Sequence, residues 1–177
     1  MAKSITRRTL RGFRQAKVNT RYFEDLINQI SNKTAKFVSQ MKQGKNYWKA
    51  NEDNDMKFTA IVGNPPYQQM DGGAGVSAKP IYNVFVDVAK LIRPKAISMI
   101  MPAKWYTDGK GLDEFRTKML RDKHIAKLVD YVDSRDCFSN VDIAGGVCYF
   151  IWDSKHNDKC EFVSVSRGIS KSSTRDL

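Results

Sequence analysis

The sequence predicts an α/β fold in which the strands of a buried sheet alternate with helices. Short apolar runs, partly β-branched, occur at residues 58–62, 96–101, 125–132 and 146–152 and have the composition of strands. Between the first three runs, apolar residues recur at helical spacing over 81–92 and 111–122. Strands that alternate with helices are typical of a mainly parallel sheet. With 177 residues, of which 41% are hydrophobic, the chain is long enough for one such domain.

The residues that flank each run support these boundaries. The run 58–62 leads into Gly63 and Pro65, and its apolar composition predicts a strand buried on both faces of the sheet. The helix 81–92 ends before Pro94, which cannot continue it. We expect the strand 146–152 to lie antiparallel to the strand 125–132, because a turn at 136–140 separates them.

The turn after the first strand carries the most specific chemical signal. It reads Asn64, Pro65, Pro66 and Tyr67, and it lies where ligands bind in α/β sheets, beyond the carboxyl end of a strand. The Asn64 side-chain oxygen and the Pro65 carbonyl are two acceptors that could each take one N–H of a conjugated amino group and localise its lone pair. The prolines stiffen the turn, and Tyr67 offers a flat face for a planar group. The pattern therefore predicts methylation of an amino nitrogen.

This turn and the blocks that follow it resemble the N6-adenine DNA methyltransferases of bacterial restriction-modification systems. The similarity covers roughly residues 45 to 170, with one departure at Thr59, where the family usually has Asp. The matching blocks after the turn are 71–75, 79–82, 85–86, 98–105, 109–116 and 145–150.

The resemblance implies a Rossmann-like methyltransferase fold that uses S-adenosylmethionine. It implies catalytic roles for Asn64, Pro65, Pro66 and Tyr67, with Asn64 and Pro65 also at the cofactor. The fold is expected to be incomplete, since nothing in residues 1–57 resembles a strand that ends in a Gly-rich cofactor loop. The Gly-rich segment 72–75 follows the turn instead, and we interpret it as a loop over the target pocket. We therefore expect a second chain to supply the cofactor loop and the target-recognition domain.

The target base should be held between aromatic rings once it is flipped out of the duplex. Tyr67 is one candidate ring, and Phe138 is the second because it lies where the family keeps a later pocket-lining motif. A core role for Phe138 is the alternative. Lys104 is a further candidate substrate contact, and Trp105 could line the pocket or pack in the core.

The positive charge of the chain is concentrated near the amino terminus. Residues 1–50 contain twelve Lys or Arg against Glu24 and Asp25, which gives +10 of the total +11. A basic arm of this kind is suited to sequence-independent contacts with DNA phosphates, although a solvated helix face would have the same composition. Residues 20–42 form an amphipathic helix, with a break expected near 31–33. We divide the chain into a basic arm with this helix, 1–45, and the catalytic part of the domain, 46–177.

Cysteine, histidine and hydropathy patterns exclude several other classes of protein. Three widely spaced Cys and two distant His favour neither a disulfide framework nor a metal site. No apolar run is long enough for a membrane span or a signal peptide, so a cytoplasmic location is expected.

Two other functions remain open from the residues. One is methylation of a different planar amide or base, such as a protein glutamine or an RNA base. The other is a non-catalytic nucleic-acid-binding remnant in which the basic arm matters and the turn does not. Double-stranded DNA is the favoured substrate because of the blocks from residue 71 onward.

Overall fold

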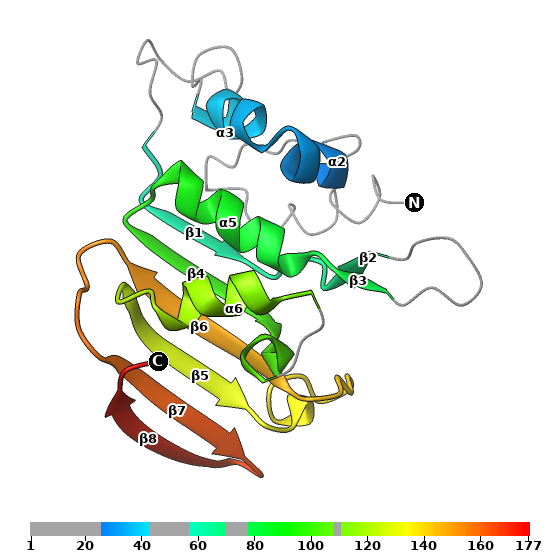
Figure 1. Cartoon of the computed structure of the whole chain (residues 1–177). Helices are drawn as coiled ribbons and strands as arrows, with labels where there is room; N and C mark the ends of the chain where they lie inside the picture. Colours follow the sequence, from blue (N-terminus) through cyan, green and yellow to red (C-terminus); the bar gives the residue numbers. More distant parts are fainter. Residues whose placement is uncertain (1–25, 43–56, 70–77, 108–110) are drawn as a thin grey trace, which may run out of the picture.

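The computed structural model describes residues 26–42, 57–69, 78–107 and 111–177 (Figure 1). Most of the basic arm, the linker before the first strand and the Gly-rich segment 72–75 lie outside these residues. No helix within the described ranges is long and apolar enough to cross a membrane. The division of the chain near residue 45 stays a prediction.

Two short helices begin the described part of the chain. They are α2, Leu26–Asn32, and α3, Thr34–Lys42, and Lys33 interrupts them. The predicted break near 31–33 is therefore confirmed. Ile30 and Phe37 are buried on these helices and pack with Val88 and Ile92 of the helix α5, Tyr82–Ile92. This small second core attaches the helix pair to the rest of the molecule.

A sheet of six strands forms the body of the protein. Its order is β1-β4-β6-β5-β7-β8, and a separate two-stranded sheet contains β2 and β3. β1 and β4 are parallel, β6 is antiparallel to both β4 and β5, β5 and β7 are parallel, and β8 is antiparallel to β7. The bounds are β1 Ala60–Gly63, β2 Gln68–Gln69, β3 Lys79–Pro80, β4 Ala96–Pro102, β5 Ile125–Tyr131, β6 Val147–Asp153, β7 Cys160–Ser166 and β8 Ile169–Arg175.

The α/β class is confirmed by the unit β1-α5-β4. Two parallel neighbouring strands joined through a helix are the building block of a Rossmann-like sheet. The predicted antiparallel arrangement of the last strong strand against β5 is also confirmed. The sheet is incomplete relative to a full methyltransferase. The sequence before β1 does not resemble a strand with a cofactor loop, and the described elements before β1 are helices.

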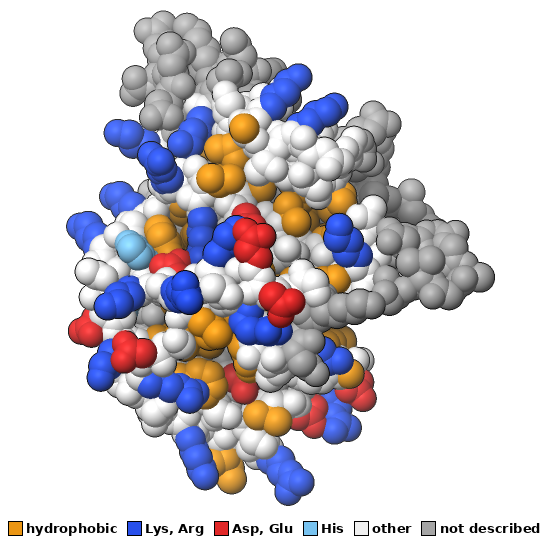
Figure 2. Space-filling model, viewed as in Figure 1, with side chains coloured by type: hydrophobic (Ala, Val, Ile, Leu, Met, Phe, Trp, Pro, Cys, Tyr) orange, Lys and Arg blue, Asp and Glu red, His pale blue; other side chains and the backbone are white. Residues whose placement is uncertain are grey.

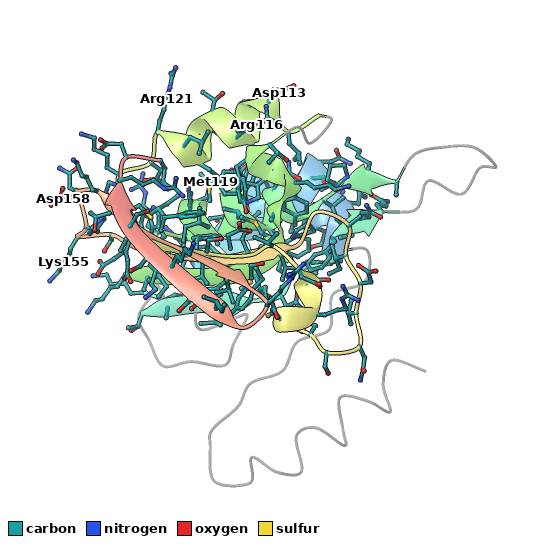
Figure 3. The ribbon with its side chains drawn as sticks, turned by 90° about the horizontal axis from the view of Figure 1, so that it is seen from below. Asp113, Arg116, Met119, Arg121, Lys155 and Asp158 are labelled. Atoms are coloured by element: carbon teal, nitrogen blue, oxygen red, sulfur yellow. The ribbon has the colours of Figure 1, made fainter. Side chains whose placement is uncertain are left out.

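Two helices that follow β1 in the chain pack on one face of the sheet. α5 and α6, Asp113–Leu120, lie side by side in front of the strands in Figure 1, and both contribute to one buried cluster. Buried and half-buried residues alternate along β4, and the buried Ile97, Met99 and Met101 belong to this cluster. Figure 3 shows Asp113 and Arg116 of α6 above the same side of the sheet. Arg116 Nε donates to the carbonyl of Trp105 at 2.8 Å and so ties α6 to the short helix η2, Ala103–Tyr106.

The expectation that the first strand is buried on both faces is wrong. The strand begins at Ala60, which is exposed, and the side chain of Val62 is 79% exposed. The reason is the face that Val62 occupies: it pairs with Ser98, so it lies on the opposite face from Ile97 and Met99, which pack in the cluster under the helices. An apolar run can therefore belong to a strand with one exposed face.

The last hairpin was not expected from the sequence. β7 and β8 are joined by Arg167 and Gly168, whose positive φ angles of 52° and 73° are those of a two-residue turn. All residues of β8 are exposed, so its sequence lacks the apolar alternation that marks a half-buried strand. Arg175 covers the ring of Phe162 with its guanidinium carbon 3.6 Å from the ring centroid.

A polar network joins α5, the turn after α6 and β6. Asp122 accepts hydrogen bonds from the Lys90 ammonium at 2.6 Å, the Trp152 indole at 3.0 Å and the His124 backbone N–H at 3.0 Å. Burial raises the pKa of Asp122, but the Lys90 ammonium and the other donors outweigh it, so the net pKa of this carboxyl is lowered. The charged form is therefore favoured in the folded protein.

This lowered pKa predicts a loss of stability in acid. A carboxyl whose folded pKa lies below its unfolded value stabilises the fold above the unfolded pKa, and the contribution disappears as the pH falls through the folded pKa. We expect the free energy of unfolding to decrease below about pH 5, and Asp122→Asn to flatten this decrease. Urea denaturation at several pH values measures it, with the exposed Asp142→Asn as the control. If the free energy of unfolding fell with pH equally steeply in Asp122→Asn and in the unchanged protein, the stabilising role of the Asp122 network would be wrong.

Candidate active site

The predicted turn follows directly from the carboxyl end of β1. Pro65 is buried, Asn64 and Pro66 are exposed, and Tyr67 is half-buried against the main core. The Tyr67 carbonyl accepts the backbone N–H of Ile81 at 3.2 Å, which closes the chain around the β2-β3 hairpin at the start of α5. The strand and this hairpin thus hold the turn at both ends.

The turn forms one wall of an open pocket of about 590 Å³. The other wall comes from the loop between β5 and β6, which contributes Phe138, Val141 and Ile143. We call this site the aromatic pocket; it is lined by Asn64, Pro65, Pro66, Tyr67, Phe138, Val141 and Ile143. Tyr67 and Phe138, which are far apart in the chain, thus line one cavity. Their roles toward a substrate stay a prediction.

The buried hydroxyl of Ser134 fixes the conformation of the loop between β5 and β6 that forms the second wall of the pocket. Ser134 is 1% exposed and begins the short helix η3, Ser134–Asp136. Its Oγ donates to the Val141 carbonyl at 2.9 Å and accepts the Ile143 backbone N–H at 2.8 Å. The Ser134 carbonyl also accepts the backbone N–H of Phe138 at 2.8 Å. Ser134 therefore holds all three pocket residues of this loop, a role for which the sequence contains no motif.

Neighbouring residues fasten the same loop from outside. Asp133 accepts the backbone N–H of Arg135 at 2.9 Å and pairs with its guanidinium, whose hydrogen bonds lower the pKa of Asp133 to about 2. Asp136 accepts the backbone N–H of Arg167 at 2.7 Å. The unexpected β7-β8 hairpin thus supports the pocket loop through its turn.

Removal of the Ser134 hydroxyl should loosen the pocket. We expect Ser134→Ala to cost about 1–3 kcal/mol, because a buried N–H and a carbonyl lose their partner. Hydrogen exchange of the Ile143 amide should become faster than in the unchanged protein. The exposed Ser139→Ala in the same loop is the matched control, and equal exchange in both variants would show that Ser134 does not anchor the wall.

The aromatic pocket is electrically neutral. Among the described residues, its lining contains no Asp, Glu, Lys, Arg or His, and Tyr67 is its one ionisable side chain. Burial, with smaller contributions from Cys137 and Cys148, raises the pKa of Tyr67, so its ring carries no charge at neutral pH. Burial likewise raises the pKa of the half-buried Cys137 thiol next to Phe138. A neutral, flat-walled cavity with amide and carbonyl acceptors at its rim suits a neutral planar group that carries N–H donors.

Two other sequence candidates lie outside this lining. Lys104 is exposed, and its stem lies so close to Gly145 that a Cβ there would come within 2.8 Å of Lys104 Cγ. Trp105 is 0% exposed and donates its indole N–H to Cys148 Sγ at 3.2 Å. Of the two alternatives for Trp105, the structure therefore shows the core one, while a substrate contact by Lys104 stays a prediction.

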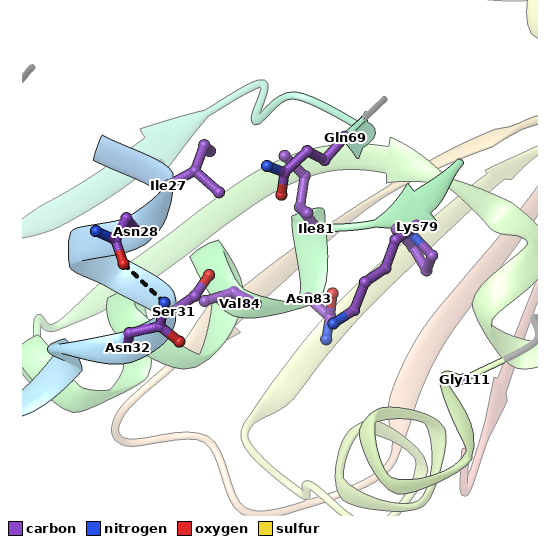
Figure 4. Close-up of a pocket in the computed structure, with 11 residues that line it drawn as sticks. Ile27, Asn28, Ser31, Asn32, Gln69, Lys79, Ile81, Asn83, Val84 and Gly111 are labelled. Atoms are coloured by element: carbon purple, nitrogen blue, oxygen red, sulfur yellow. Dashed lines mark hydrogen bonds between the residues drawn. The ribbon is translucent and has the colours of Figure 1, made fainter. Parts of the chain in front are cut away.

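A second, polar pocket lies near the β2-β3 hairpin (Figure 4). Its volume is about 600 Å³, and its lining includes Asn28, Asn32, Gln69, Lys79 and Asn83. Asn32 donates to Asn28 across 2.7 Å. Asn83 Oδ1 is buried without a hydrogen-bond partner among the described residues. The sequence contained no signal for this pocket beyond the scattered amides.

The described residues supply one rim of a cofactor site and no metal centre. Asn64 and Pro65 stand at the end of β1, next to its unpaired edge in the described sheet. The described chain before β1 is helical and adds no Gly-rich loop after a strand. Within the same ranges, no group of three or more His, Cys, Asp or Glu could hold a metal ion.

The sequence of the chain matches a known family model over most of its length. Residues 1–138 match the model described as Eco57I restriction-modification methylase. The chain belongs to this family. Its 64–67 turn, β1 and Phe138 all lie within the matched residues, whereas β6, β7 and β8 lie beyond them.

Individual relatives of this Eco57I-family chain are larger proteins. It is 37% identical over 146 residues to an uncharacterized adenine-specific methylase of Mycoplasma pneumoniae, and the match covers 73% of the chain and 34% of that relative. The chain therefore spans about a third of the length of the curated relative it matches.

Solved structures of restriction-modification proteins are also similar to this family member. One is the type I methyltransferase subunit from Streptococcus thermophilus, with a TM-score of 0.48, 12% identity, and 76% of this chain and 31% of that chain covered. Another is the type IIG restriction endonuclease BpuSI, with a TM-score of 0.44, 15% identity, and 60% and 15% covered. Since both scores are below 0.5, the family assignment rests on the sequence match.

Proposed function

We propose that this chain is the part of a restriction-modification adenine-N6 DNA methyltransferase that holds the target base. The observation that supports it is the aromatic pocket, in which the 64–67 turn and Phe138 line one cavity. Membership of the Eco57I family and the likeness to an adenine-specific methylase favour DNA adenine over an RNA base or a protein glutamine. The substrate in this proposal is double-stranded DNA with the target adenine flipped out.

Each residue of the turn has a role in the proposal. The Asn64 side-chain oxygen and the Pro65 carbonyl each accept one N–H of the adenine amino group, which keeps its lone pair available for the methyl group. Tyr67 and Phe138 contact the faces of the base. The rest of the neutral lining offers no charged group that would compete with Asn64 and Pro65 for the amino N–H groups. Pro66 keeps the turn rigid, so that orientation supplies most of the rate enhancement.

S-adenosylmethionine would supply the methyl group, but the described residues fit only its reactive end. Asn64 and Pro65 form a rim at the end of β1, and the elements described before this strand are the helices α2 and α3. We propose that a second chain provides the cofactor loop and the target-recognition domain. Equilibrium dialysis of the purified chain should then show no binding of S-adenosylmethionine at micromolar concentrations. Binding at that level would disprove the need for a second chain and leave the base-pocket proposal intact.

Binding of an unpaired adenine tests the base pocket directly. We expect the chain to bind a duplex with one unpaired adenine more tightly than the same duplex with an unpaired thymine. Tyr67→Ala and Phe138→Ala should each weaken adenine binding about 5- to 150-fold, since a stacked base contributes about 1–3 kcal/mol. Fluorescence anisotropy at fixed salt measures these affinities.

A matched control and two competitors complete this experiment. Ile169→Ala removes a side chain that is 66% exposed on β8, far along the sheet, and should have no effect. Equal affinity for adenine and thymine would contradict a base pocket. Stronger competition by a bulged RNA adenine or a glutamine peptide would instead favour one of the other planar substrates.

A further inference from the structure

The end of the sheet opposite to the aromatic pocket is one continuous edge. The Thr59 carbonyl accepts the backbone N–H groups of Lys95 and Ala96, both at 3.1 Å. The Lys95 carbonyl in turn accepts the N–H of Ser154 at 2.9 Å, and the His124 carbonyl accepts the N–H of Asp153 at 2.9 Å. These bonds join the turns at the ends of β1, β4, β6 and β5 side by side, in agreement with the strand order.

Positive side chains are gathered on this edge. We define the basic edge as Lys57, Arg93, Lys95, Lys123 and Lys155, all of which are exposed. Figure 2 shows a concentration of Lys and Arg on this side of the molecule, around a histidine. Figure 3 shows Lys155 and Arg121 at the same end of the sheet, projecting away from it. None of the five forms an ion pair with another residue of the described ranges.

The carboxylates on these turns do not neutralise the basic edge. Asp122 is held by Lys90 at 2.6 Å, so its charge is already paired. Asp153 uses Oδ1 to accept the backbone N–H of Lys155 at 2.9 Å, which caps the turn. Asp153 and the exposed Asp158 are outside the ion pairs of the described residues, and Asp158 lies on the same β6-β7 turn as Lys155. Asp176 lines a small pocket together with Lys123 and Asp158. Five cations therefore face three unpaired carboxylates, so the edge keeps a net positive charge.

The kind of cation favours phosphates over a protein partner. Four of the five residues are Lys, which is depleted in protein interfaces relative to Arg. Lys is a point charge on a flexible stem, suited to phosphates that present no fixed geometry. At about 4.8 Å between strands, the four strand ends span about 15 Å, a length over which a DNA duplex carries about nine phosphates.

We propose that the basic edge is a second nucleic-acid-binding surface, which contacts the phosphate backbone without reading sequence. It is separate from the aromatic pocket, because the seven residues of β4 place the two ends of the sheet about 20 Å apart. A nucleotide in the pocket cannot reach the edge, so the edge binds a more distant segment of nucleic acid. This inference does not depend on methyl transfer or on the identity of the target base.

The salt dependence of DNA binding tests the proposal in the full chain. The variant K95Q/K123Q/K155Q removes three cations from adjacent turns. Binding to a random duplex of about 30 base pairs, measured between about 50 and 200 mM salt, should lose about three units of the slope of log affinity against log salt. Polyglutamate, added as a competitor of equal charge, should displace the duplex poorly.

The control variant K79Q/K118Q/K171Q makes the same change in net charge at exposed positions outside the edge and outside the basic arm. It should leave the slope close to that of the unchanged chain. Equal losses in both triple variants would show that only net charge matters and would overturn the proposal. So would an unchanged slope in the edge variant, provided its melting temperature is preserved, or efficient displacement by polyglutamate.

Discussion

Gly146→Ala should destabilise the protein by about 3–5 kcal/mol, which is a large part of the stability of an ordinary domain. Gly146 has a φ of +75°, and a Cβ at this position would lie 2.2 Å from the Tyr131 carbonyl and 2.8 Å from that of Val132. Both neighbours are backbone atoms at the end of β5, so they cannot move aside as a side chain would. Chemical denaturation measures the change in the free energy of unfolding.

The chain contains a matched control for this substitution. Gly168 has nearly the same conformation, with a φ of +73°, but nothing lies within 4 Å of a Cβ there. Gly168→Ala should therefore cost only the backbone strain, about 1 kcal/mol. If the two variants were equally stable, the close approach of the β5 end to Gly146 would be wrong. Because Gly146 accepts the N–H of Ala103 and donates to Ile143, the same variant should also disturb the pocket loop.

Trp105→Ala should cost a similar amount, about 3–5 kcal/mol, by leaving a cavity in the core. The ring is 0% exposed and packs edge-on against Tyr106 and Phe115, with centroids 5.0 Å and 5.8 Å away. Since Trp105 is absent from the lining of the aromatic pocket, the folded variant should bind an unpaired adenine as the unchanged protein does. Denaturation and anisotropy on the same sample separate the two effects.

A milder variant makes this prediction sharper. Trp105→Phe keeps most of the buried volume and loses mainly the indole hydrogen bond to Cys148, so we expect a smaller loss of stability, about 1–2 kcal/mol. A fall in adenine affinity at unchanged stability would instead place Trp105 in contact with the base, as the other sequence interpretation held.

The parts of the site that could be predicted are those encoded locally. The 64–67 turn follows from four adjacent residues and the strand before them, and the helices α5 and α6 follow from apolar spacing. Phe138 could be proposed only through the family resemblance, since its approach to the turn depends on how β5 and β6 are placed in the sheet.

The parts that could not be predicted depend on pairing between distant segments. The exposure of Val62 is set by which face of the sheet the helices cover, which an apolar run does not reveal. Ser134 matters because it bonds to residues several positions later in its loop, and no motif marks it. Gly146 lies in a block that resembles the family, but the resemblance does not reveal its close contact with the end of β5. β8 could not be predicted because a strand exposed on both faces shows no alternation of apolar and polar residues.

The insertion of β6 between β4 and β5 has a consequence for how the chain folds. β4 and β5 precede β6 in sequence but do not pair with one another. β4 therefore lacks its second neighbour, and β5 lacks both of its neighbours, until later strands are made. Closing the sheet therefore requires loop closure between distant segments, which slows folding relative to a protein of local contacts. Until β6 arrives, β4 and β5 expose apolar strand edges that can pair with other chains. During synthesis the nascent protein should thus depend on chaperones until residues past Asp153 have left the ribosome.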